Sequence, residues 1–248
     1  MTIDAHTDAP WLAGVDGCPA GWVAVFVKPA GGEARVRVIA RFADVLAAAE
    51  APAVIAVDMP TGLPERAGKG GRHAENLIRP LLGARQSSVF SVPARAAVYA
   101  DDYREACAVA LATSDPPRKV SKQLFNIAAK IREVDEAVRS SGATARTYEV
   151  HPELAFWRMN GERALSEPKK VKSRPFPAGL EQRRGLLIAA GFPPEAVRAA
   201  PPKGAAADDL IDAFACTAVA RRIHAGLARP FPDPPERDGF GLPMAIWA

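Results

Sequence analysis

Cysteine is scarce in this chain of 248 residues. The three thiols, at Cys18, Cys107 and Cys216, are odd in number, lie far apart and form no CxxC pair. This pattern supports neither a disulfide framework nor a zinc knuckle. We expect three buried free thiols and a protein of a reducing compartment.

Long hydrophobic runs are also lacking. The most apolar stretch, Val45 to Val57, is interrupted by Glu50 and Pro52 and is too short to cross a bilayer. The first ten residues, MTIDAHTDAP, contain two acidic residues and no apolar segment, so they do not resemble a secretory signal. These features predict a cytoplasmic protein that has no membrane partner.

Neither sign of charge dominates the chain. Its 32 Lys and Arg against 28 Asp and Glu give a formal net charge of +4, and hydrophobic residues make up 48%. This composition is typical of a folded globular protein. The small positive excess permits a polyanionic partner such as nucleic acid, although charge of this size also serves solubility alone.

The order of the predicted elements defines the fold class. Alternating or apolar β-rich runs at 11–15, 22–27 and 34–39, joined by turns rich in Gly and Pro, predict three antiparallel strands. A short helix at 42–50 precedes the apolar run 53–57, which is typical of a strand covered on both faces. The remaining pattern predicts a fifth strand at 144–150 and helices at 74–82, 102–112, 121–138, 179–190 and 208–225. This order predicts an α/β fold of the ribonuclease H-like type, in which a mixed sheet (three antiparallel strands, then two parallel strands) is flanked by helices.

Residues 1–248 are predicted to form a single domain of this type with two additions. The first is a loop and helical insertion at about 61–140, which begins with an irregular Gly-, Arg- and Ser-rich stretch at 61–95. Loops of this length inside a compact domain are more often functional than neutral, so we expect this stretch and the 121–138 helix to cover a site. The second is a Pro-rich C-terminal tail at about 229–248, for which the sequence allows packing on the core or an interface arm.

Two aspartates follow strands that are predicted to be adjacent. Asp16 ends the first strand and Asp58 ends the fourth. The carboxyl ends of parallel strands meet at the sheet edge where sites form in α/β proteins. Because two carboxylates at one edge repel each other, a divalent cation is the usual means of stabilising them. Asp16 alone is equally compatible with capping its own turn.

The segment AADDLIDAFACTAVARR adds a third acidic element on the last helix. Asp208 and Asp209 suit the first helical turn, where aspartate is favoured in any case. Asp212 shares a face with the apolar residues Cys216 and Val219, where an unpaired carboxylate is costly. We therefore expect Asp212 to have a cation or a positively charged partner, and we predict metal ligation by Asp16, Asp58, Asp209 and Asp212.

The segment TYEVHPELAF lies at the end of the fifth strand. Glu149 ends that strand and is predicted to reach the same acidic site, whereas Glu153 suits the first turn of the helix that follows. His151 is predicted to be a structural hydrogen-bonding residue, because no second histidine stands near it in the sequence. The predicted catalytic set is Asp16, Asp58, Glu149, Asp209 and Asp212.

Six sequence blocks also carry a family resemblance. In chain order they are GVDGCPAGWVAV, AVDMPTGLP, SSVFSVPAR, VSKQLFNIAAKIREVDEAV, YEVHPELAF and DDLIDAFACTAVA, and they span roughly residues 12–226. Together they resemble the domain-of-unknown-function 429 family, whose members are described as predicted nucleases of the ribonuclease H fold. The resemblance implies an acidic site made of Asp16, Asp58, Glu149 and either Asp209 or Asp212. It also draws attention to Ser121, Lys122, Gln123 and Lys130.

A nuclease of this kind would use two Mg²⁺ or Mn²⁺ ions about 4 Å apart, bridged by the carboxylates, to hydrolyse DNA or RNA. Basic residues would contact phosphates, which positions a nucleic acid without specifying its sequence. The predicted phosphate contacts are Arg72, Arg85, Lys122, Lys130 and Lys170, the last within a basic run at 169–174 that is equally compatible with a solvated loop.

Two other functions remain open at the level of sequence. The first is a phosphotransferase of the actin and sugar-kinase type, which shares the core but normally repeats it and has small hydroxyl residues where this chain has Gly17-Cys18-Pro19-Ala20-Gly21. The second is a non-catalytic module that binds nucleic acid or protein and keeps the acidic edge for folding.

Overall fold

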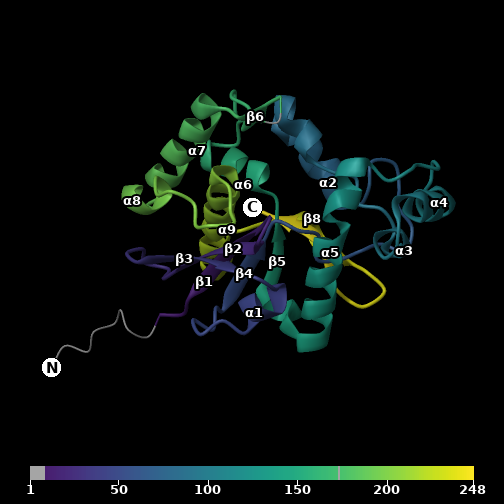
Figure 1. The fold of residues 1–248 in the computed structure, drawn as a ribbon, viewed down its shortest axis with the longest axis horizontal. Helices are drawn as coiled ribbons and strands as arrows, with labels where there is room; N and C mark the ends of the chain where they lie inside the picture. The colour runs from purple at the N-terminus through teal and green to yellow at the C-terminus, as the bar shows by residue number, and fades with distance from the viewer. Residues whose placement is uncertain (1–8, 173) are drawn as a thin grey trace.

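A seven-stranded mixed sheet forms the centre of the structure, a computed structural model that describes residues 9–172 and 174–248 (Figure 1). The strand order is β3-β2-β1-β4-β5-β9-β8. Three strands pair in antiparallel fashion: β1 (Leu12–Cys18), β2 (Gly21–Val27) and β3 (Ala34–Ile39). On the other side of β1, β4 (Val54–Val57) pairs parallel with β1, and β5 (Thr147–Val150) pairs parallel with β4. The predicted ribonuclease H-like arrangement is therefore confirmed. The prediction that no secretory signal is present depends mainly on residues 1–8, which lie outside the described part.

The C-terminal tail extends this sheet. Strand β9 (Pro243–Trp247) runs parallel to β5, and β8 (Pro230–Arg237) pairs with β9 at the outer edge. Proline is compatible with an edge strand because one side of that strand has no ladder to complete. Of the two alternatives left open by the sequence, the structure shows the tail packed on the core.

Helices cover both faces of the sheet (Figure 1). One face packs against α1, α3, α4 and α5, and the other against α6, α7, α8 and α9. No helix in the described residues is long and apolar enough to cross a membrane. The bounds are α1 Phe42–Leu46, α2 His73–Ile78, α3 Arg95–Val98, α4 Tyr103–Thr113, α5 Lys122–Ser141, α6 Pro152–Met159, α7 Pro177–Ala189, α8 Pro194–Val197 and α9 Ala207–His224, with 3₁₀ helices η1 Arg79–Ser88 and η2 Ala143–Arg146 and a small hairpin of β6 Lys170–Val171 and β7 Arg174–Pro175.

Local sequence signals account for the longest helix of the insertion. The hydroxyl of Ser121 accepts a hydrogen bond from the Leu124 amide at 3.2 Å and caps the start of α5. Gly142, with φ of 67°, adopts the left-handed conformation that ends it. The apolar stripe predicted for residues 121–138 is buried in the core.

Two predicted strand ends were wrong. Strand β1 continues to Cys18, because it pairs with β2 as far as Gly21, so Asp16 lies within the strand instead of ending it. Strand β5 begins at Thr147 and not at 144, because residues 143–146 form the 3₁₀ helix η2. In both cases the backbone pairing, which the sequence pattern does not contain, sets the end.

Helix α9 packs unusually close to β1. A Cβ atom added to Gly14 would lie 2.2 Å from the Thr217 amide nitrogen and 2.3 Å from the Ala213 carbonyl oxygen. Only glycine allows this approach. Since Ala213 follows Asp212 directly, the contact also brings an acidic residue of α9 up to the sheet.

Candidate metal centre

Strand register places Asp16 and Asp58 at the same level of the sheet. Val15 pairs with Val57 in the parallel β1–β4 ladder, and the Asp58 amide donates to the Val15 carbonyl at 3.0 Å. Along β1, side chains alternate between the two faces, and Asp16 shares the face of Gly14, against which α9 packs. Both aspartates therefore face the same helix.

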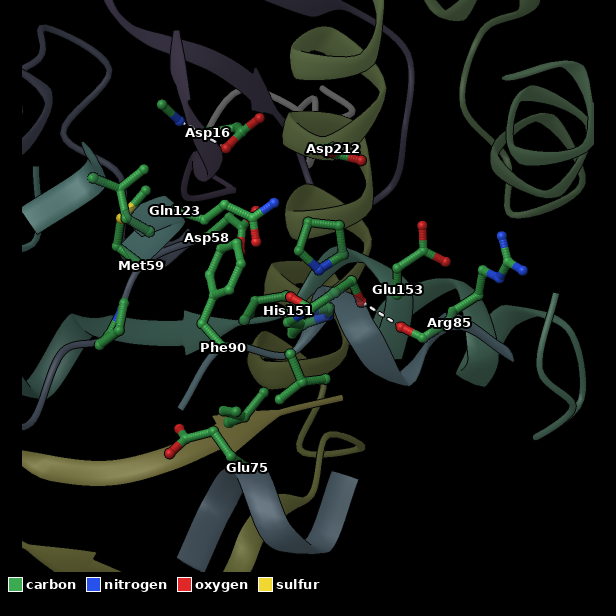
Figure 2. Close-up of a pocket in the computed structure, with 18 of the residues that line it drawn as sticks. Asp16, Asp58, Met59, Glu75, Arg85, Phe90, Gln123, His151, Glu153 and Asp212 are labelled. Carbon is green, nitrogen blue, oxygen red and sulfur yellow. Dashed lines mark hydrogen bonds between the residues drawn. The ribbon is translucent and has the colours of Figure 1, made fainter. Parts of the chain in front are cut away.

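Asp212 of α9 completes an acidic triad with these two residues. One carboxylate oxygen from each of Asp16, Asp58 and Asp212 lies within 4.8 Å of the other two (Figure 2). The predicted convergence of Asp16, Asp58 and one helix aspartate is confirmed, and Asp212 is the helix member. At this spacing each pair of ionised carboxylates repels by at least about 3 kcal/mol at the effective dielectric constant of a protein site.

The repulsion and the burial raise the proton affinity of all three groups. Burial, followed by the charges of Asp58 and Asp212, raises the pKa of Asp16 well above its ordinary value. Burial and the charge of Asp212 raise the pKa of Asp58 to about 8. Burial raises the pKa of Asp212 to about 6, and the positive charge of Lys169 limits this rise. The triad thus lacks enough positive charge to hold three ionised carboxylates.

Lys169 supplies part of the missing charge. Its ammonium group forms an ion pair with Asp212. Burial alone would lower the pKa of Lys169, but the carboxylates of Asp212 and Asp16 outweigh it and raise that pKa. The sequence predicts a cation or a positively charged partner for Asp212, and in the structure Lys169, the first residue of the basic run at 169–174, is such a partner.

Hard oxygen donors remain available at the triad. Within the described part of the chain, Oδ1 of Asp212 and Oδ1 of the adjacent Asp208 are buried and have no hydrogen-bond partner. Asp16 accepts one bond of 2.7 Å, from the Gly17 amide to its Oδ1. A set of carboxylate oxygens that lack partners fits a hard divalent cation such as Mg²⁺ or Mn²⁺.

The family model described as "Protein of unknown function (DUF429)" matches residues 14–237, which include the whole triad. The chain belongs to the DUF429 family. No curated protein and no solved structure matches the chain.

The other predicted acidic residues of this DUF429 protein lie beside the triad but have partners of their own. Asp209 folds back on its helix and accepts a bond of 2.8 Å from the Ala206 amide. Asp208 forms an ion pair of 2.6 Å with Lys170. Lys170 was predicted to contact a phosphate. Its ion pair with Asp208 leaves its charge less available for that role.

Glu149 is separated from the triad by the phase of its strand. It pairs in register with Val57, the neighbour of Asp58, so its side chain lies on the opposite face of the sheet from Asp58. There it forms an ion pair with Arg72 and accepts a bond of 3.0 Å from the Thr61 amide. Glu149 nevertheless lines the same pocket as the aspartates, as predicted, but it is paired with Arg72 and is not a member of the triad.

Arg72 lines the pocket, but its charge is already paired. Its guanidinium is buried between Glu75 and Glu149, and it also donates to the Gly62 carbonyl at 2.7 Å. Because all of these bonds are internal, Arg72 fixes the loop after β4 against β5 and is not free to bind a phosphate. No signal in the sequence separates this buried arginine from a surface one.

Two other predicted phosphate contacts, Lys122 and Lys130, are not among the residues that line the pocket. The ammonium of Lys122 stacks over the Tyr103 ring, 4.2 Å from its centroid. Lys130 donates to the Gly21 carbonyl at 2.6 Å and lies over the ring of Trp22. Arg85 lines the pocket (Figure 2) and forms no ion pair within the described residues.

The pocket itself has a volume of about 770 Å³ and contains the triad. As predicted, the 61–95 segment and α5 both line it, the former through residues such as Phe90 and the latter through Gln123. His151 also lines it, but its Nε2 is 3.3 Å from the Ser88 carbonyl and burial lowers its pKa, which agrees with the predicted structural role. All three cysteines are buried and free, as expected.

Proposed function

We propose that this DUF429 protein is a Mg²⁺- or Mn²⁺-dependent nuclease that hydrolyses phosphodiester bonds at the acidic triad. The observation that carries the proposal is the convergence of Asp16, Asp58 and Asp212 within 4.8 Å in a buried setting that raises their pKa values. Such a set is costly to folding unless a cation neutralises it, because crowded carboxylates repel each other and burial penalises their charge.

Asp16, Asp58 and Asp212 would hold the cation, with the other acidic residues at the start of α9 beside them. A divalent cation bound there would supply Lewis-acid polarisation of the phosphoryl oxygen and would lower the pKa of bound water. The chain contributes geometry. The β1–β4 register fixes two carboxylates, and the contact of Gly14 with α9 fixes the third.

Lys169 has a definite part in this proposal. Its ammonium is the positive charge closest to Asp212 in the described structure, and it neutralises the helix side of the triad. Cation binding then competes with this ion pair. Once the cation is bound, the Lys169 ammonium would be available to contact a substrate phosphate, the role expected for the basic run at 169–174.

The test is cleavage of labelled single-stranded DNA, duplex DNA, RNA and branched DNA by the purified protein. We expect cleavage with Mg²⁺ or Mn²⁺ but not with Ca²⁺, which accepts looser shells and misplaces the attacking water. Asp16→Asn should abolish cleavage without unfolding the protein. Asp101→Asn, a change at an exposed aspartate outside the pocket, serves as the matched control and should retain full activity.

Retained cleavage in the Asp16→Asn protein would contradict the proposal. If the wild type cleaves none of these substrates but transfers phosphate from ATP, a phosphotransferase replaces it. If it binds nucleic acid without cleavage, and this affinity survives Asp16→Asn, the protein is a binding module. We further propose a cytoplasmic location, which suits three free thiols.

A further inference from the structure

The pocket has two chemically different halves. The acidic half contains the triad and the acidic residues of α9, and the apolar half contains the apolar side chains of the 59–92 segment and α5. Charged and polar residues such as Arg72, Glu75 and His151 also line the pocket. A phosphodiester backbone alone would need no apolar surface. The apolar half is lined by Met59, Pro60, Val89, Phe90, Val92, Leu124, Ile127 and Ile131, and further apolar residues line the pocket elsewhere.

Phe90 and Gln123 stand out within this second half, and both line the same pocket as Asp58 (Figure 2). Phe90 is only partly buried and packs against the core, so part of its ring stays accessible. The Gln123 side chain is exposed, and its amide forms no hydrogen bond within the described residues. An accessible aromatic ring and a free amide are the groups that proteins use to stack and to hydrogen-bond an unpaired base.

The distribution of cations argues against a long duplex track. Of the five basic residues predicted to contact phosphates, Arg72 and Lys170 are held in ion pairs with carboxylates. Lys122 and Lys130 are not among the residues that line the pocket. A protein that tracks a duplex neutralises many phosphates, whereas Arg85 alone of this set lines the pocket without an ion pair in the described structure.

The size of the pocket agrees with a small ligand. Its volume of about 770 Å³ lies within the range of about 300–1,000 Å³ over which pockets enclose most of a small-molecule ligand. One nucleotide fits this class, with its phosphate at the acidic half and its base at the apolar half. A paired base inside a duplex cannot enter such a pocket without leaving its stack.

We propose that the pocket accepts a single unpaired nucleotide, with the base against Phe90 and the Gln123 amide at its edge, so that the substrate is a single-stranded end or a short oligonucleotide. The substrate assignment rests on the proposed nuclease function. The base site itself does not, since it depends on Phe90 and Gln123 and not on turnover.

Binding can be measured without catalysis. Titration calorimetry in Ca²⁺ would compare adenosine 5′-monophosphate with ribose 5-phosphate, which lacks the base. We expect the nucleotide to bind about 10-fold more tightly, since stacking of one base on one aromatic ring has this magnitude. Phe90→Ala should remove the difference, Phe90→Tyr should keep it because the ring remains, and Gln123→Ala should reduce it. Phe240→Ala, at an exposed aromatic residue outside this pocket, is the control and should behave as the wild type.

Equal affinity of the wild type for the two probes would overturn the inference, as would an unchanged difference in the Phe90→Ala protein. Activity separates the two proposals. If the wild type distinguishes the probes but cleaves no nucleic acid, the nucleotide site stands and the nuclease proposal fails. If it cleaves duplex DNA faster than single strands, the nuclease proposal stands and this inference fails.

Discussion

Replacing Asp58 by asparagine tests whether the acidic triad is under electrostatic strain when no metal is bound. Asparagine keeps the shape of the side chain and removes the charge. Within the described residues the Asp58 carboxyl takes part in no hydrogen bond or ion pair, so the substitution removes no favourable contact of that kind. The change therefore isolates burial and the repulsion by Asp212, the two leading causes of the raised pKa.

The expected effect follows from that pKa. Its value rises from 3.8 to about 8 in the folded protein, and a tenfold change in proton affinity corresponds to about 1.4 kcal/mol. At about pH 7 the folded state thus loses about 4 kcal/mol relative to an unfolded chain whose carboxyl ionises freely. Asp58 is only partly buried, so water screens part of this, and we expect Asp58→Asn to stabilise the metal-free protein by about 2–4 kcal/mol.

The sign of the pH dependence is fixed by the same comparison. The folded protein binds the proton of each carboxyl more tightly than the unfolded chain does. The stability that each protonated carboxyl contributes is therefore fully present at acidic pH and is lost as the pH rises through about 6 for Asp212 and about 8 for Asp58. The metal-free wild type should therefore lose stability as the pH rises from about 4, where the unfolded carboxyls ionise, to about 8, above which the loss levels off. The Asp58→Asn protein should show a shallower slope over this range.

Thermal unfolding in EDTA measures both effects. For a chain of this length the expected stabilisation raises the midpoint by about 5–15 °C. Adding Mn²⁺ should raise the midpoint of the wild type much more than that of the variant, because the variant has lost a ligand. Asp101→Asn is the control for loss of one exposed negative charge. An Asp58→Asn protein with an unchanged midpoint at about pH 8 and an unchanged slope would refute the assignment of strain to the triad.

Three other substitutions probe the framework and the counter-charge of the site. Gly14→Ala should destabilise the protein by about 3 kcal/mol or more, because the new methyl group meets the backbone of α9; it should also weaken Mn²⁺ binding through Asp212, and normal binding in calorimetry would contradict this. Arg72→Met should cost about 3–5 kcal/mol in urea unfolding, since two buried carboxylates lose their partner; addition of Glu149→Gln should recover part of the loss, and no recovery would count against the pairing. Lys169→Met should increase Mn²⁺ affinity several-fold by removing a competing cation from Asp212, whereas an unchanged or lower affinity would show that the ammonium does not compete.

The membership of the acidic site was only partly predictable from the sequence. Asp16 and Asp58 were predicted because each stands at the carboxyl end of a β-rich run, and adjacent parallel strands bring such ends together. The choice among the helix acids was less accessible. The sequence places Asp212 on the apolar face of the helix and Asp209 in its first turn, but it does not exclude Asp209 as a ligand. In the structure Asp209 accepts a hydrogen bond from the Ala206 amide and caps α9.

The basic residues were the least predictable, because a charged side chain finds its partner through tertiary contacts. Arg72 lies in a predicted loop, Lys130 on the polar face of a predicted helix and Lys170 in a basic run. In each case the sequence indicates a charged side chain that is free to bind a phosphate. The fold places the first between two buried glutamates, the second over a tryptophan ring and the third against Asp208. Such pairings join residues far apart in the chain, so no local pattern contains them.

The sequence by itself determined the class of the sheet, the order of its first five strands and the two aspartates near the carboxyl ends of β1 and β4, because hydrophobic periodicity and turn residues are local properties. Only the tertiary structure decided that Glu149 faces away from those aspartates, since a shift of one residue in strand phase reverses the face and the register depends on pairing between distant segments. The same holds for the tail, which joins the sheet as β8 and β9 because β5 offers an unpaired edge, a feature that exists only once the chain has folded.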